Sequence, residues 1–176
     1  MHIVTLLGNN QSGKTSLCSQ WKGCPATSSY VTTIEVVQYE FEGMIVNDTP
    51  SCARFPFDLE RLCLKTDLFV LVVNEDNEDQ HLYEQLSTDW PRRQWLLLLN
   101  GPGPFLNMRL WALSNDIRVY QLDVKTGHGV LDALTNIREA LEVIVPRSNS
   151  LDLTADPRLL APRLIPFLGV LYSSCV

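Results

Sequence analysis

Four short apolar runs along the chain have the length and composition of buried strands. The first run, His2 to Leu7, is partly β-branched and stops at Gly8. Near-continuous apolar runs of this kind are typical of strands that are covered on both faces of a sheet. The other three runs predict strands at Leu68 to Val73, Gln94 to Leu99 and Ile117 to Leu122.

A hairpin is predicted between the first two of these runs. Apolar residues alternate with polar ones from Ile34 to Phe41, a Glu42-Gly43 turn follows, and Met44 to Val46 is apolar again. Alternation on both sides of a turn is the pattern of two antiparallel strands. Residues 48–66 are expected to be irregular, because Pro50 and Pro56 oppose a long helix.

Helical spacing of apolar residues separates the predicted strands. A helix is expected from about Lys14 to residue 22, and a short one around residues 79–88. Apolar residues at i, i+4 and i+7 indicate the buried face of a further helix, formed by Leu106, Leu110 and Leu113. The clearest amphipathic helix carries Val130, Leu134, Ile137, Leu141 and Ile144.

Strands and helices thus alternate over residues 1–145, and this order predicts an α/β domain with a mainly parallel sheet of about six strands and helices on both faces. Residues 146–176 do not follow the alternation and contain four of the ten prolines, so we expect a C-terminal tail. Its large apolar residues, such as Leu164 and Phe167, must be buried. They would cover a groove of the same domain, or dock on a partner or a membrane surface.

Composition narrows the class of protein. In 176 residues the net charge is −6, which argues against a nucleic-acid partner. No apolar run approaches the ~20 residues of a membrane-spanning helix, and no signal-like segment precedes the first strand. The five cysteines show no CxxC spacing, so we expect reduced thiols in a cytoplasmic protein.

One motif carries chemistry, and it has the form GxxxxGK[ST]. It comes directly after the first predicted strand and opens a helix, which is the setting that phosphate binding requires. Glycines let backbone N–H groups surround a polyphosphate, and the helix directs its positive dipole end to the same place. Lys14 would reach the β- and γ-phosphates, and the Thr15 hydroxyl would bind Mg²⁺. The predicted phosphate loop is Gly8, Asn9, Asn10, Gln11, Ser12, Gly13, Lys14 and Thr15.

From this motif onward the chain resembles the small GTPases of the Ras-like and Era-like P-loop group, over about residues 2 to 145. The resemblance implies a three-layer P-loop NTPase fold, the small G domain, and GTP or GDP with Mg²⁺ as ligands. The short spacing between Thr33 and Asp48 looks more like compact Era-type domains such as the ethanolamine-utilisation protein EutP. A fainter resemblance is to centromere protein M, a pseudo-GTPase of the kinetochore that lacks an intact phosphate loop.

The resemblance also assigns the metal and the γ-phosphate sensors. Thr33, or its neighbour Thr32, matches the switch threonine that closes over Mg²⁺, and Asp48 matches the aspartate that supports the metal. Ser51 stands at the place of a γ-phosphate-sensing glycine, and Cys52 at that of a water-orienting glutamine. Cysteine serves that role poorly, so hydrolysis is expected to be slow.

At the base site the chain departs from the family. The family pattern N-K-x-D is replaced by Asn100-Gly101-Pro102-Gly103, so only the loop-tying asparagine is kept. Asp123-Val124-Lys125-Thr126-Gly127, however, resembles the family's S-A-K-T-G loop, in which the N–H at the place of Val124 meets the base oxygen. Asn100, Val124 and Lys125 are therefore candidate base-site residues, while the preference for guanine over adenine stays open.

Three functions fit this pattern. The first is a divergent small GTPase-like switch or assembly component, with protein partners at the switch loops or the tail. The second is a pseudo-GTPase that serves as an interaction scaffold in a multiprotein complex, and the third is a P-loop ATPase or kinase with relaxed base choice. The intact phosphate loop favours the first.

Overall fold

The computed structural model describes residues 1–24, 33–41, 43–51, 56–75, 80–89 and 93–143. The chain divides into two compact units, Met1–Ile144 and Val145–Val176, and all described residues belong to the first. The predicted tail at residues 146–176 and Ile144 lie outside the described residues.

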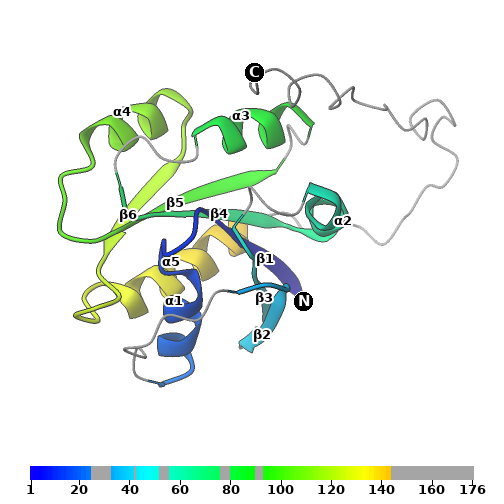
Figure 1. Ribbon diagram of the computed structural model, residues 1–176, viewed down its shortest axis with the longest axis horizontal. Helices are drawn as coiled ribbons and strands as arrows, with labels where there is room; N and C mark the ends of the chain where they lie inside the picture. Colours follow the sequence, from blue (N-terminus) through cyan, green and yellow to red (C-terminus); the bar gives the residue numbers. More distant parts are fainter. Residues whose placement is uncertain (25–32, 42, 52–55, 76–79, 90–92, 144–176) are drawn as a thin grey trace, which may run out of the picture. The chain divides into compact units, whose positions relative to one another are not determined.

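A six-stranded sheet forms the centre of the first unit (Figure 1), in the order β2-β3-β1-β4-β5-β6. β2 is antiparallel to β3, and every other neighbouring pair is parallel. The mainly parallel sheet expected from the alternation of elements is confirmed. The strands are β1 (His2–Leu7), β2 (Val37–Phe41), β3 (Met44–Asp48), β4 (Leu68–Val73), β5 (Gln94–Asn100) and β6 (Arg118–Leu122).

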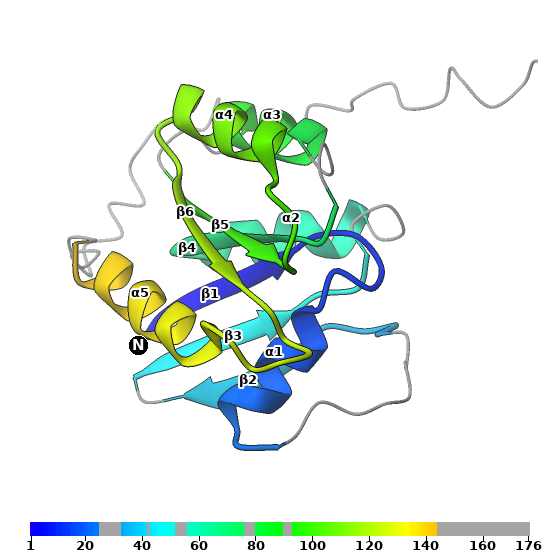
Figure 2. The same ribbon diagram turned by 90° about the vertical axis from the view of Figure 1, so that its left-hand side faces the viewer.

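Helices cover both faces of the sheet and make three layers (Figure 2). One apolar core joins the sheet to α1 (Lys14–Trp21) and α5 (Val130–Val143), and it includes Leu17 and Ile137, which are fully buried. A second core, on the opposite face, joins the sheet to α2 (Pro56–Lys65), α3 (Gln80–Asp89) and α4 (Leu106–Ser114), through residues such as Cys63 and Met108. Alternate strand residues supply the two cores because successive side chains point to opposite faces.

The segment expected to be irregular contains a helix, so that prediction is wrong. α2 begins at Pro56, and proline is favoured at the first helical position because its missing N–H has no partner there in any case. Pro56 therefore starts a helix here. The hairpin also begins later than predicted, since β2 starts at Val37 and Ile34 is exposed.

The helix predicted from Leu106, Leu110 and Leu113 exists, but its buried face is a different one. These three leucines are 61%, 55% and 78% exposed, whereas Met108 and Ala112 are fully buried. The buried face of α4 is therefore set by residues four apart that the leucine spacing does not include. Within the described part of the chain, no helix is both long and apolar enough to cross a membrane.

Candidate functional site

The phosphate-loop motif lies where the order of strands in the sheet reverses. β1 is flanked by β3 and β4, so the chain leaves β1 for one side of the sheet and later returns to the other. Ligands of open α/β sheets bind at the carboxyl ends of strands at such a switch point. The loop from Gly8 to Gly13 follows the carboxyl end of β1, and Asp48 ends the neighbouring β3.

Two glycines give the loop its path. Gly8 has φ +142°, and a Cβ there would lie 2.2 Å from the carbonyl oxygen of Val72. Gly13 has φ +101°, and a Cβ there would lie 2.3 Å from Nδ2 of Asn100. Both positions have a backbone conformation that favours glycine. At Gly8 the near atom belongs to the backbone and excludes a side chain, whereas at Gly13 the Asn100 side chain would have to move. The two fixed glycines of the motif are thus explained by packing.

Lys14 spans the loop from the first turn of α1. Its Nζ donates to the carbonyl oxygens of Gly8 and Asn9, each at 2.8 Å, and to Oγ of Ser12 at 3.2 Å. The side chain is only 6% exposed, so the ammonium charge is held inside the ring that the loop forms. The amino end of α1 adds a partial positive charge at the same place. The loop can therefore receive an anion.

Oxygen atoms gather on the other side of Lys14. The Thr15 hydroxyl donates to Oδ2 of Asp48 at 2.7 Å, and the Thr15 and Thr33 hydroxyls are 2.8 Å apart. Asp48 is fully buried, and within the part of the chain that the structure describes its Oδ1 has no hydrogen-bond partner. Burial raises the pKa of this carboxyl, against the lowering effects of the Thr15 hydrogen bond and the Lys14 charge.

This oxygen cluster fits a small divalent cation. Mg²⁺ is a hard ion that prefers carboxylate, hydroxyl, phosphate and water oxygens. A cation beside Asp48 would satisfy the unpaired oxygen and stabilise its ionised form, since an opposite charge favours the charged state of a buried carboxylate. Among the described residues no group of three or more His, Cys, Asp or Glu side chains could hold a metal, so a site here would combine the Asp48 carboxylate with hydroxyl and phosphate oxygens.

Asn100 ties two loops of the site together. Its Nδ2 donates to the carbonyl oxygen of Ser12 at 2.8 Å, and its Oδ1 accepts from the N–H of Val124 at 3.1 Å. The carbonyl oxygen of Val124 in turn accepts from Nε2 of Gln20 on α1. The loop-tying role that the resemblance implies for Asn100 is therefore present in the contacts. The N–H of Val124, which the resemblance assigns to the base oxygen, is engaged in this brace.

The loop that replaces the guanine motif is held in place from outside. The Gln121 amide donates to the carbonyl oxygens of Gly101 and Gly103 at 2.8 and 3.0 Å. Arg109 donates to Oε1 of Gln121 at 2.6 Å and to the carbonyl oxygen of Pro104 at 3.2 Å. The glycines and prolines of residues 101–104 therefore form one wall of the cavity, and hydrogen bonds hold that wall in place.

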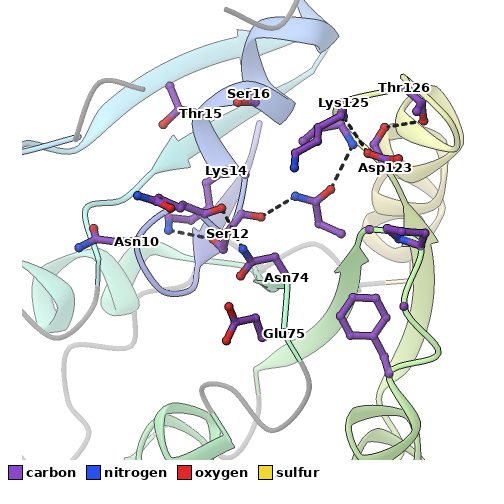
Figure 3. Close-up of a pocket in the computed structure, with 18 of the residues that line it drawn as sticks. Asn10, Ser12, Lys14, Thr15, Ser16, Asn74, Glu75, Asp123, Lys125 and Thr126 are labelled. Carbon is purple, nitrogen blue, oxygen red and sulfur yellow. Dashed lines mark hydrogen bonds between the residues drawn. The ribbon is translucent and has the colours of Figure 1, made fainter. Parts of the chain in front are cut away.

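A cavity of about 870 Å³ lies between these loops. Figure 3 shows Lys14 and Ser12 of the phosphate loop on one side, and Asp123, Lys125 and Thr126 on the other. This volume is in the range of small-molecule sites. Of the sequence-predicted site residues, the cavity is lined by Asn10, Gln11, Ser12, Gly13, Lys14, Thr15, Thr33, Ser51, Asn100, Val124 and Lys125.

The remaining predicted residues lie behind this lining or outside the described chain. Gly8 and Asn9 support Lys14, and Asp48 supports Thr15. Thr32 and Cys52 are outside the described residues.

Sequence reasoning missed the supporting residues Gln20, Asn74, Arg109 and Gln121. Asn74, for example, donates to the carbonyl oxygen of Gln11 at 3.3 Å. No local pattern marks such residues, because each acts through a contact with a distant loop.

Comparison with known proteins supports the fold. No protein-family model matches the chain, and no curated protein matches it at the level of sequence. Among solved structures, a bacterial selenocysteine-specific elongation factor, EF-Sec, superposes with a TM-score of 0.66 at 16% identity. The match covers 82% of this chain and 30% of the elongation factor, so this chain corresponds to less than a third of that protein. The chain therefore shares the fold of the matched part of the elongation factor. The predicted three-layer α/β P-loop architecture is confirmed.

Proposed function

We propose that the chain is a divergent small GTPase-like protein that binds a nucleoside di- or triphosphate together with Mg²⁺. The phosphates would bind to the loop from Gly8 to Thr15, and the base would lie beside Asn100 and Lys125. The protein would act as a switch or an assembly component, through protein partners that contact its switch loops or its tail.

The observation that carries the proposal is an anion site in the cavity with a buried carboxylate directly behind it. The phosphate loop and Lys14 line the cavity at the amino end of α1, while Asp48, buried behind Thr15, has one carboxylate oxygen with no hydrogen-bond partner among the described residues. An unpaired buried carboxylate oxygen is costly. A polyphosphate with its bound Mg²⁺ complements both halves of the site at once.

Within the proposed complex, Lys14 and the loop N–H groups would hold the β- and γ-phosphates, and Thr15 would turn its hydroxyl oxygen toward the metal. Mg²⁺ would neutralise phosphate charge and bridge the phosphate oxygens. Thr33 and Ser51 are the proposed sensors of the γ-phosphate. Hydrolysis is expected to be slow, because cysteine at position 52 cannot orient water as a glutamine amide does.

A scaffold without nucleotide is the second candidate. It is favoured by the three acceptors that already surround the Lys14 ammonium and by the glycines at positions 101 and 103. A nucleotide would have to compete with those acceptors for Lys14. The two candidates therefore differ in one measurable quantity, the affinity for a Mg²⁺-nucleotide.

The test compares two lysine substitutions by isothermal titration calorimetry with Mg²⁺ and GDP. Lys14→Ala removes a charge-assisted contact to phosphate, and we expect affinity to fall at least ~100-fold. Lys22→Ala is the matched control, because Lys22 is exposed and lies over the ring of Tyr39, outside the cavity. Its affinity should stay within about threefold of the parent. Unchanged affinity in the Lys14→Ala protein would refute the site.

A further inference from the structure

The lining of the cavity is of two chemical kinds. The phosphate loop contributes the positive charge of Lys14, whereas residues 101–104, with the sequence Gly-Pro-Gly-Pro, contribute no charge. Glycine has no side chain, and the proline ring neither donates nor accepts a hydrogen bond. This stretch of the lining therefore offers a ligand no side-chain group that could read a hydrogen-bonding pattern.

The backbone carbonyl groups of the same stretch are committed to other partners. The carbonyl oxygens of Gly101 and Gly103 accept from Nε2 of Gln121. The carbonyl oxygen of Pro104 accepts from Nε of Arg109. Neither Gln121 nor Arg109 lines the cavity, so these carbonyl groups are directed away from it. A ligand that lies against this stretch meets a mainly apolar surface.

An aromatic ring backs this surface. Phe105 also lines the cavity and is only 4% exposed, and a Cβ added to Gly103 would meet its ring at 3.4 Å. We call residues 101–105 the apolar wall. Contact between such a wall and a planar ring depends on the area buried, and not on the donors and acceptors at the edge of the ring. Every nucleobase has a planar face, so this kind of contact tolerates any base.

The second loop of the lining, residues 123–126, uses its polar groups on internal contacts. The N–H of Val124 donates to Oδ1 of Asn100 at 3.1 Å, and the Asp123 carboxylate accepts from the N–H of Lys125 at 2.9 Å. A base that paired with the N–H of Val124 would have to break its bond to Asn100. The two residues after Val124 are exposed, so water can replace a contact between their side chains and a base.

We propose that the cavity binds nucleoside polyphosphates through their phosphates and does not discriminate between bases. A site rejects the wrong base when that base leaves a buried donor or acceptor of the site unpaired. The apolar wall has no side-chain group to leave unpaired, so guanine and adenine fit it equally well. This inference rests on the proposed nucleotide-binding function and adds the class of ligand to it.

The direct test is isothermal titration calorimetry of the parent protein with Mg²⁺ and either GDP or ADP. We expect the two dissociation constants to agree within about threefold, because the same phosphate contacts and the same apolar wall serve both ligands. A larger difference overturns the inference and leaves the proposed polyphosphate site standing. Binding of neither nucleotide overturns both the inference and the proposed function.

Gly103→Asp introduces a group that the apolar wall lacks. Gly103 has no positive φ, and a Cβ there would make an ordinary contact with the Phe105 ring, so a side chain fits. A carboxylate accepts from both the ring N–H and the amino group of guanine, whereas adenine presents an acceptor nitrogen at that ring position. We expect the ratio of the ADP to the GDP dissociation constant to rise at least about tenfold. Repulsion of the phosphates affects both ligands and cancels in this ratio.

Gly103→Ala is the matched control, because it adds the same Cβ without a polar group. Its ratio should stay within about threefold of the parent's ratio. An unchanged ratio in Gly103→Asp, or an equal change in Gly103→Ala, would mean that the base does not lie against the apolar wall. Either result would overturn the inference.

Discussion

At the scale of single residues, Gly13 is the position where the phosphate-loop motif meets Asn100. Its missing Cβ makes room for Asn100, which packs against the backbone there. Gly13→Ala would combine a strained positive φ, which costs about 1–2 kcal/mol, with a displaced Asn100 brace. We expect the free energy of unfolding to fall by about 2–5 kcal/mol, measured by urea denaturation.

Gly43→Ala is the matched control for that change. Gly43 also has a positive φ, +81°, but a Cβ there would meet nothing within 4 Å. It should cost only the backbone strain, about 1–2 kcal/mol. Equal losses at the two positions would mean that contact with Asn100 is not what requires glycine at position 13.

The phosphate-loop residues could be predicted because their chemistry lies in eight consecutive positions. In the structure Lys14 donates to the carbonyl oxygens of Gly8 and Asn9, and Asp48 accepts from Thr15 across 33 positions of sequence, while the binding of phosphate and metal by these residues stays a prediction. The supports of the base site could not be found in this way. Gln121 and Arg109 hold the loop through backbone carbonyl oxygens, which any residue could supply, and contact each other across 12 positions, so no local sequence pattern marks them.

At the scale of elements, the leucine spacing in α4 correctly predicts a helix but predicts the wrong buried face. Leucine at i, i+4 and i+7 marks one face of α4, but Met108 and Ala112 occupy the core. Helical periodicity predicts that apolar residues share a face. It does not predict which face the sheet will cover when both carry apolar residues. α2 gives a similar lesson, since a proline that breaks a helix interior can also begin a helix.

The buried face of α4 can be tested by two substitutions. Met108→Ala should lower the free energy of unfolding by about 2–5 kcal/mol, because it leaves a cavity in the core. Leu110→Ala, on the exposed face, should change it by less than about 0.5 kcal/mol. Thermal and urea denaturation of the two variants measure both quantities. A larger loss of unfolding free energy in Leu110→Ala than in Met108→Ala would mean that the leucine face of α4, and not the Met108 face, packs in the core.

At the scale of the whole molecule, the order of strands explains why one cavity receives contributions from so many loops. β1, β3 and β5 all end at the same edge of the sheet, so Gly8, Asp48 and Asn100 are neighbours there although they are far apart in sequence. The alternation of apolar runs and helical spacings was sufficient to predict this parallel sheet. The identity of a bound base depends on side-chain contacts within the cavity, which alternation does not contain.

The most direct test of the account is the melting temperature of the purified protein with GDP, GTP, ADP or ATP, each with Mg²⁺ and with EDTA. A ligand at 100 times its Kd stabilises the folded state by about 2.7 kcal/mol, which for a chain of this size raises the melting temperature by about 5–10 °C. The account predicts such a rise with a nucleotide and Mg²⁺, and a smaller one with EDTA. No rise with any nucleotide would contradict it and leave the fold as a scaffold.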